Sequence, residues 1–311
     1  MTDEAMRTAL ADVATGLVTP FDEDGEIDHD ALAENAQALN QQGIDLFFAC
    51  GNISEYHALT HEERIAVTET SVTALPDDAT VLAGIGGSIP TAVELGNHAE
   101  AAGCDAHMVM PPDHTFKHEA GLRTYYRRIG DRLHRPLIPY LRRFSPSIDF
   151  VAALTEMDPV AGIKWAIDDV PAFGDAVAAG SDDVVWLNGL GERHAIAMHA
   201  QGATGMASGI GNFEPAIGRS LFAALEANDY QRAREIRAAA RPYMRFREAT
   251  GTGNSLAGGQ SVAAVKAGLD LAGLTGGHVR PPLVDLDEAA REQAASLYTE
   301  LEGFCAGSRS H

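Results

Sequence analysis

Lysine is scarce in this chain of 311 residues, because Lys117, Lys164 and Lys266 are its only lysines. The other twenty of its 23 basic residues are arginine, while aspartate and glutamate number 44, so the formal net charge is −21. A field of this sign repels phosphate backbones, which argues against nucleic acid as a partner. An acidic, lysine-poor surface is typical of a halophilic protein, since concentrated salt screens the repulsion between its acidic groups.

Cysteine is equally scarce. The three cysteines, Cys50, Cys104 and Cys305, are odd in number and widely spaced, which excludes a disulfide framework and a Cys-x-x-Cys metal site. We expect Cys50 and Cys104 to pack in the core. His114 and His118 are four residues apart, but no His-Glu-x-x-His motif is present. The sequence therefore predicts no metal cofactor.

Long apolar runs are also missing. No run approaches the roughly 18 residues that suggest a membrane span. Residues 1–10 are acidic and lack the basic and then apolar order of a signal peptide. We therefore expect a cytoplasmic protein without a membrane partner.

Short apolar runs alternate with longer amphipathic ones along most of the chain. Near-continuous apolar strands separated by helices indicate a parallel sheet. Eight strand–helix units, with 20 to 36 residues between strand starts, predict an α/β fold of the (β/α)₈ TIM-barrel type. A doubly wound sheet would need a glycine-rich loop after the first strand, where Thr19-Pro20-Phe21 stands instead. The expected strands are residues 13–18, 44–50, 80–85, 106–110, 136–141, 160–165, 184–187 and 204–208.

Beyond Asn212 the strand pattern stops and helical patterns continue. We expect a barrel domain at 1–215 and a helical C-terminal subdomain at 216–311. Asp287 is a plausible N-cap of the last helix, and Gly307 is expected beyond its end. The expected helices are residues 30–42, 216–227, 230–246, 261–272 and 287–304.

Lys164 stands inside the apolar sixth strand, Val160-Ala161-Gly162-Ile163-Lys164-Trp165. Burial of a charged lysine is costly, and it lowers the pKa of the amine. A neutral lysine can form an imine, which an arginine cannot, and this chain otherwise prefers arginine. The pattern favours a catalytic nucleophile, although a lysine that reaches solvent or an acidic partner at the barrel mouth would fit it too.

Two further places lie at strand ends, where TIM-barrel active sites are built. Tyr140 ends the fifth strand, next to the sixth, and could move protons for Lys164 unless it merely caps the core. After the second strand, Gly51-Asn52-Ile53-Ser54-Glu55 offers backbone N–H groups near Ser54 and Glu55 for a substrate carboxylate. A plain turn with Ser54 as a helix cap explains this segment equally well.

Together these features resemble the dihydrodipicolinate synthase and N-acetylneuraminate lyase family over nearly the whole chain. The resemblance implies a Schiff-base lysine at Lys164, a catalytic tyrosine at Tyr140 and a substrate-binding role for Ser208. It also implies a 2-keto acid substrate, no organic cofactor or metal, and a homotetramer. The matching stretches are Gly16-Leu17-Val18-Thr19-Pro20-Phe21, Gly51 to Glu55, Gly84-Ile85-Gly86, Pro111-Pro112, Tyr140, Gly162-Ile163-Lys164, Gly205 to Gly209 and Val279-Arg280-Pro281-Pro282.

The chain departs from the family pattern at residues that would relay protons or contact a second substrate. Asn52 and Ile53 replace two threonines; an asparagine amide can still bind a carboxylate, but isoleucine relays no proton. Pro112-Asp113-His114 and Leu141-Arg142-Arg143 replace residues of the lysine-pathway enzymes. Arg142 or Arg143 could face a distal carboxylate or hydroxyls of the substrate.

The sequence therefore predicts a lyase that cleaves or dehydrates a 2-keto-3-deoxy sugar acid. Three alternatives stay open: 4-hydroxy-tetrahydrodipicolinate synthase of lysine biosynthesis, a non-catalytic 2-keto-acid-binding barrel, and a metal-dependent lyase.

Overall fold

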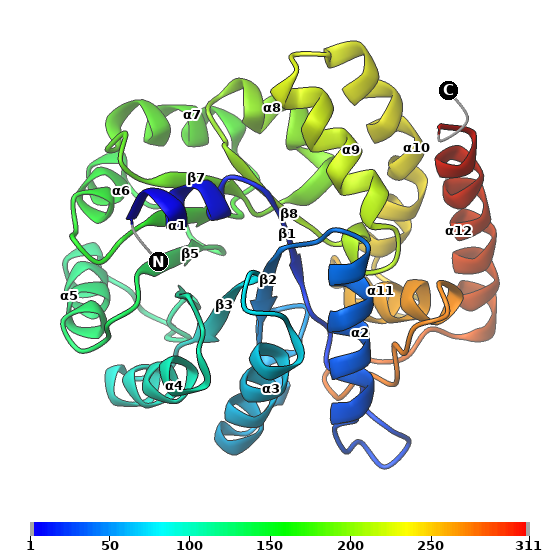
Figure 1. Cartoon of the computed structure of the whole chain (residues 1–311), viewed down its shortest axis with the longest axis horizontal. Coiled ribbons are helices and arrows are strands. Elements are labelled where there is room, and N and C mark those ends of the chain that lie inside the picture. The colour runs from blue at the N-terminus through cyan, green and yellow to red at the C-terminus, as the bar shows by residue number, and fades with distance from the viewer. Residues whose placement is uncertain (1–2, 309–311) are drawn as a thin grey trace.

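The protein is a closed barrel of eight parallel strands in chain order, surrounded by helices, in a computed structural model that describes residues 3–308. Figure 1 shows the strands at the centre and the helices around them. This arrangement confirms the predicted TIM barrel, and each expected strand is present with its ends shifted by two residues at most. The strands are β1 (Val13–Gly16), β2 (Leu46–Ala49), β3 (Thr80–Ile85), β4 (Ala106–Val109), β5 (Leu137–Leu141), β6 (Gly162–Trp165), β7 (Val185–Asn188) and β8 (Gly205–Ser208).

One helix follows each strand, a short helix α1 (Asp3–Leu10) precedes β1, and three helices complete the C-terminal part. The barrel helices are α2 (His29–Gln41), α3 (His61–Ala74), α4 (Ile89–Ala102), α5 (Glu119–Gly130), α6 (Ile148–Thr155), α7 (Val170–Ala179), α8 (Ala195–Ala200) and α9 (Pro215–Glu226). The C-terminal helices are α10 (Tyr230–Glu248), α11 (Ser261–Leu271) and α12 (Glu288–Ser308), and the 3₁₀ turns are η1 (Tyr56–Ala58), η2 (Gly191–Arg193) and η3 (Ile210–Asn212).

Short polar side chains define where many helices begin. Thr60 accepts a hydrogen bond from the Glu63 N–H while the Glu63 side chain accepts one from the Thr60 N–H, which is a complete capping box for α3. Asp287 accepts a bond of 2.8 Å from the Ala290 N–H, as predicted for an N-cap. The expectation for Gly307 is wrong, because α12 runs on to Ser308 and includes it.

Strand register decides which side chains enter the barrel, because successive side chains point to opposite faces of a strand. Lys164 pairs with Tyr140 on one side and with Leu187 on the other, and Leu187 pairs with Gly205. These four positions therefore share the inner face. Ser208 lies three residues after Gly205 and consequently belongs to the outer face.

The outer faces of the strands pack against the helices. One core cluster joins Val13 of β1 and Met206 of β8 to apolar residues of α9, α10, α11 and α12. Figure 1 shows α10, α11 and α12 gathered on one side of the barrel. The domain boundary expected at residues 215 and 216 stays a prediction, since α9 both completes the eighth unit and packs on α10.

Cys50, Cys104 and Cys305 are free and buried, and Cys50 and Cys104 belong to core clusters, as the sequence suggested. Within residues 3–308, no helix combines the length and apolar character that a membrane crossing requires.

Candidate active site

Lys164 lies inside the barrel with only 8% of its surface exposed. Its Nζ is 3.4 Å from the Met108 Sδ and 3.7 Å from the centre of the Phe48 ring. The ring centre of Tyr140 is 4.7 Å away. Among the ion pairs of residues 3–308, none includes Lys164. The amine is therefore enclosed by sulfur and aromatic faces rather than by carboxylates.

These surroundings change the protonation of the amine. Burial, together with the positive charge of Arg142, lowers the pKa of Lys164 from 10.5 to about 7. An unperturbed lysine is neutral in roughly 1 molecule in 2,500 at pH 7, whereas a pKa near 7 leaves roughly half of the amines neutral. Lys164 is thus able to act as a nucleophile near neutral pH.

The hydroxyl oxygen of Tyr140 accepts two hydrogen bonds at the barrel mouth, which is the carboxyl end of the strands. Asn52 Nδ2 donates over 3.2 Å from the loop after β2, and Arg142 Nη1 donates over 3.0 Å from the end of β5. Both bonds use the oxygen as acceptor, so the hydroxyl proton remains available to a substrate. Arg142 is half-buried and faces the site, whereas Arg143 is exposed and has a φ of 60°.

The loop after β2 uses most of its polar groups internally. The N–H groups of Ser54 and Glu55 donate to the carbonyls of Gly51 and Asn52, each over 3.1 Å. The Ser54 hydroxyl accepts from the Gly51 N–H and donates to the Leu17 carbonyl. The expectation that N–H groups near Ser54 and Glu55 hold the substrate carboxylate therefore needs correction, because the turn already uses them.

Two residues of this loop remain turned toward the site. The N–H groups of Asn52 and Ile53 have no hydrogen bond within the described chain. The Ile53 side chain covers Gly16 at the end of β1, so closely that a Cβ there would lie 2.7 Å from the Ile53 Cγ2. Asn52 and Ile53 consequently border the barrel mouth together with Tyr140.

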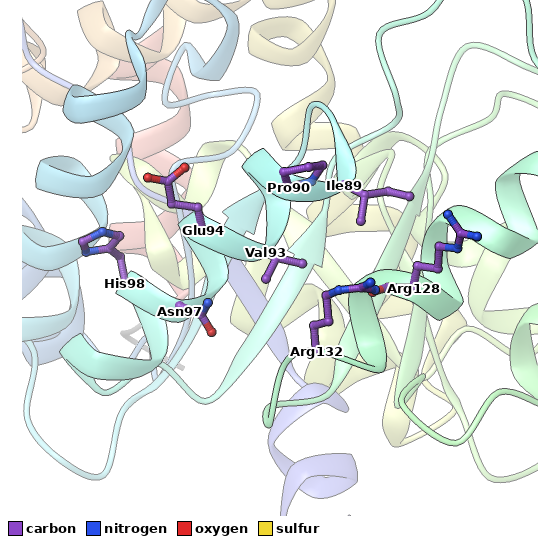
Figure 2. Close-up of a pocket in the computed structure, with 8 residues that line it drawn as sticks. All are labelled: Ile89, Pro90, Val93, Glu94, Asn97, His98, Arg128 and Arg132. Atoms are coloured by element: carbon purple, nitrogen blue, oxygen red, sulfur yellow. The ribbon is translucent and has the colours of Figure 1, made fainter.

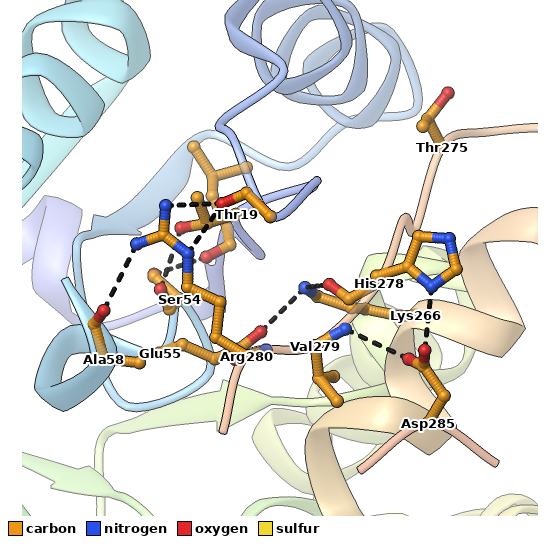
Figure 3. A network of polar contacts seen from close by, with 12 residues as sticks. Thr19, Ser54, Glu55, Ala58, Lys266, Thr275, His278, Val279, Arg280 and Asp285 are labelled. Carbon is orange, nitrogen blue, oxygen red and sulfur yellow. Dashed lines mark hydrogen bonds and ion pairs between the residues drawn. The ribbon is translucent and has the colours of Figure 1, made fainter. Parts of the chain in front are cut away.

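Glu55 belongs to a buried polar network between the loop and the C-terminal part (Figure 3). Its Oε1 is 2.7 Å from Lys266 Nζ, and its Oε2 accepts a bond of 2.9 Å from the Arg280 N–H. Lys266 also donates to the His278 carbonyl. Glu55 therefore has no free oxygen for a substrate, and its predicted binding role is replaced by a structural one.

Arg280 extends the same network. Its guanidinium forms two bonds to the Glu63 carboxylate, of 2.7 and 2.8 Å, and lies 4.2 Å over the Phe21 ring. These contacts join the segment before α12 to α3 and to the loop after β1. The sequence had marked Arg280 only by resemblance, since its acidic partner lies 217 positions away.

Ser208 lies on the outer face of β8, away from Lys164. Its hydroxyl donates to the buried Glu192 carboxyl and accepts a bond of 2.8 Å from the Gly211 N–H. The expected substrate contact is therefore corrected to a contact between the barrel and its helical layer. The glycine–serine pattern gave no information on the face, which depends on strand register.

Two further side chains reach the mouth. His57 follows the β2 loop and is exposed; partial burial lowers its pKa, which the nearby Asp113 raises and the nearby arginines, among them Arg142, lower. Arg247 of α10 packs against Gly209, the residue directly after β8. Sequence analysis missed Arg247, because no local pattern shows that a C-terminal helix directs this side chain toward the strand ends.

A surface hollow lies elsewhere, on the outer helical layer (Figure 2). Ile89, Val93 and His98 of α4 line one side of it, and Arg128 and Arg132 line the other. It contains none of the residues around Lys164. No group of three or more potential metal ligands occurs in residues 3–308.

Comparisons with known proteins give a consistent result. A sequence model of the Dihydrodipicolinate synthetase family matches residues 9–301. A probable 5-dehydro-4-deoxyglucarate dehydratase 1 of Streptomyces coelicolor is 31% identical over 296 residues, which cover 92% of this chain and 90% of the relative.

Solved structures agree with this match. Dihydrodipicolinate synthase from Oceanobacillus iheyensis superposes with a TM-score of 0.91 at 30% identity, covering 97% of this chain and 100% of that one. YagE of E. coli K12, solved in complex with pyruvate, gives a TM-score of 0.83 at 25% identity over 93% of this chain and 98% of its own. The chain therefore belongs to the dihydrodipicolinate synthetase family and is a lyase on that family's TIM barrel.

Proposed function

We propose that this protein is a class I lyase that binds a 2-keto acid as an imine on Lys164. The observation that carries the proposal is a buried lysine without an acidic partner, whose pKa burial lowers to about 7, beside the hydroxyl-bearing Tyr140. Such an amine is nucleophilic without further activation. The pyruvate complex of YagE supports a 2-keto acid head group.

The chemistry follows from these groups. The neutral Nζ attacks the keto carbon, and Tyr140 delivers a proton to the carbonyl oxygen, which leaves as water. The resulting protonated imine withdraws electrons from the adjacent carbon. The deprotonated Tyr140 then takes a proton from carbon 3 and returns it to the 4-hydroxyl, which the enamine expels as water. In the cleavage reaction Tyr140 instead takes the proton of the 4-hydroxyl, the bond between carbons 3 and 4 breaks with its electrons passing to the imine, and an aldehyde leaves. Hydrolysis of the imine returns the free lysine.

The carboxylate of the head group is assigned to Asn52 and Ile53. Their two N–H groups have no partner within the described residues, and the Asn52 amide already points at Tyr140. Adjacent free N–H groups at a turn form an anion-binding nest. Arg142 stands next to this position and is free to contact the rest of the substrate through Nη2.

The substrate proposed is a 2-keto-3-deoxy sugar acid, which the enzyme dehydrates or cleaves. Arg142, His57 and Asp113 offer donors and acceptors to a polyhydroxylated tail. The Streptomyces coelicolor relative is named for such a compound, 5-dehydro-4-deoxyglucarate. Steady-state kcat/KM on 2-keto-3-deoxy acids, compared with pyruvate plus aspartate semialdehyde, tests the proposal. A faster condensation would contradict it.

The main alternative is condensation by a dihydrodipicolinate synthase, which the Oceanobacillus iheyensis structure favours through its 30% identity. Ile53 argues against it, because an isoleucine has no hydroxyl with which to pass a proton to Tyr140. A barrel that binds 2-keto acids without turnover would also lack this hydroxyl, but it would have no use for a lysine of depressed pKa.

We also propose a cytoplasmic homotetramer adapted to salt, with the covalent imine in place of any cofactor. The family resemblance supports the assembly, and the net charge of −21 supports the adaptation. Sedimentation equilibrium at molar KCl checks the assembly, and a mass of one or two chains would contradict it.

A further inference from the structure

Arg247 belongs to helix α10 in the C-terminal part of the chain, and its guanidinium group lies beside the barrel. Its guanidinium packs on Gly209 at the carboxyl end of β8, where a Cβ atom would overlap Nη1. Its Nε donates to the Ser261 hydroxyl over 3.3 Å, which holds the side chain between α10 and the start of α11. The two terminal nitrogens have no hydrogen bond within residues 3–308. Arg247 thus presents an unused planar fork of donors near the barrel mouth.

Glu192 and Glu248 lie near this guanidinium and raise its pKa, but neither forms an ion pair with it. Glu248 pairs with Arg193 over 3.5 Å. Glu192 bonds to Ser208, and burial raises the pKa of its carboxyl, which favours the neutral form. No acid within the described chain lies at ion-pair distance from Arg247 or from Arg142.

Arg142 and Arg247 also influence each other. Burial lowers the pKa of Arg247, the charges of Glu192 and Glu248 raise it, and the positive charge of Arg142 lowers it. Arginine keeps its proton in proteins, so this proximity is a cost to the free enzyme. An anion between the two guanidinium groups would remove that cost and accept bidentate bonds from both forks.

We propose that Arg247 and Arg142 bind the distal carboxylate of a dicarboxylic 2-keto acid whose keto end is held at Lys164. This inference rests on the proposed function and narrows its substrate to diacids of the aldaric type. A hydroxyl at the same place carries no charge and would leave both guanidinium groups without a counter-ion. Arg247 is then a specificity residue that the C-terminal part contributes to the barrel.

Imine trapping tests the inference without requiring turnover. The enzyme is incubated with 2-oxoadipate, a six-carbon diacid, or with 2-oxohexanoate, its monoacid counterpart, and reduced with borohydride. Intact mass gives the concentration of each acid that traps half of the protein. The wild-type protein should need about 10- to 100-fold less diacid than monoacid, the usual range for charge-assisted bonds.

Variants identify the residue responsible. Arg247→Gln should bring the ratio of the two concentrations close to one, while Arg247→Lys should keep part of the preference. Arg245→Gln is the matched control, because Arg245 is exposed on the same helix, and it should retain the wild-type ratio. Each ratio compares two ligands on one protein preparation, so partial unfolding does not affect it.

The outcomes separate the two proposals. If wild type forms an adduct with pyruvate but traps diacid and monoacid equally, or if Arg247→Gln keeps the preference, the inference is overturned and the imine mechanism stands. If pyruvate gives no adduct at all, the proposed function fails and the inference fails with it.

Discussion

Two of the three lysines are buried, and their surroundings are opposite. Lys164 lies among Phe48, Met108 and Tyr140 without an acid, whereas Lys266 touches the Glu55 carboxylate at 2.7 Å and donates to the His278 carbonyl. Burial lowers the pKa of both amines, but at Lys266 the charge of Glu55 raises it again. Burial alone therefore does not make a lysine reactive.

The presence or absence of an acidic partner decides what each buried lysine can do. At Lys266 the buried charges compensate each other, and the pair joins the β2 loop to α11. At Lys164 the same compensation would fix the proton on the amine and prevent attack on a carbonyl. We therefore expect Lys164 to form the imine and Lys266 to contribute only to the stability of the fold. The following experiments test these two roles, from the largest expected effect to the smallest.

The largest effect is expected at Lys164. Pyruvate plus borohydride should add one reduced adduct to the wild-type chain, and peptide mapping should place it on Lys164. Lys164→Arg keeps the positive charge but cannot form an imine, so the adduct and the activity should disappear. An adduct of undiminished yield in this variant, on Lys266 or Lys117, would end the proposed mechanism.

Tyr140→Phe should slow turnover by roughly 10²–10⁴, the usual loss for a general acid–base group. The ring that packs beside Lys164 stays, but the hydroxyl contacted by Asn52 and Arg142 is removed. Steady-state kcat measures the loss, and the melting temperature serves as the control for folding. A variant within threefold of wild type would show that another group moves the proton.

Lys266→Met should destabilise the fold by about 3–5 kcal/mol, because Glu55 then keeps an uncompensated buried charge. Chemical denaturation measures the free energy of unfolding. Lys266→Met combined with Glu55→Gln should recover part of the loss, since no buried charge is left alone. Equal losses in the single and double variants would show that packing, rather than the ion pair, is at stake.

Lys164→Met should have the opposite sign. Between pH 7 and 10.5 the unfolded chain holds a proton on this lysine that the folded chain, with a pKa of about 7, has released. Wild-type stability therefore rises with pH across that window, and the full cost of the buried charge applies below it. Lys164→Met should therefore stabilise the protein most below pH 7. Chemical denaturation at pH 6 and pH 10 measures the gain in the free energy of unfolding, which should be smaller at pH 10; an equal gain at both pH values would contradict this.

The same pKa sets the pH dependence of imine formation. Below about pH 7 the fraction of neutral Lys164 falls roughly tenfold per pH unit, so the initial rate of pyruvate trapping should fall with it. Above pH 8 the rate should be level. A midpoint near pH 10 would indicate a lysine with ordinary solvation.

The smallest effect concerns neither lysine but the acidic surface around them. Added KCl should raise the melting temperature by several degrees, because it screens the repulsion behind the net charge of −21. Thermal unfolding from low to molar salt measures this. A flat response would mean that the surface charges are already balanced locally.

Sequence patterns were sufficient to predict the barrel and the neighbouring positions of Lys164 and Tyr140 within it. Near-continuous apolar strands at regular spacing have few ways to bury both faces, and a closed parallel barrel is one of them. Lys164 and Tyr140 were identifiable because a polar group within an apolar strand is costly and consequently rare. Their pairing across β5 and β6 follows from the chain order of the strands.

Other site residues depended on register and on distant partners. The prediction placed Ser208 on the correct strand but on the wrong face of it. The face is fixed by the register of β8 with β1 and β7 and cannot be read from the neighbouring residues in the sequence. Glu55 was placed at the substrate because nothing near it in sequence reveals Lys266, 211 positions later.

The sequence by itself determined the fold class and the burial of Lys164 beside Tyr140, because burial and periodicity are local properties of a strand. Only the tertiary structure decided that Lys164 has no acid, that Lys266 has one, and that Arg247 reaches the barrel mouth from α10. Charges interact across space without regard to their separation along the chain, so partners of this kind become visible only when the chain is folded.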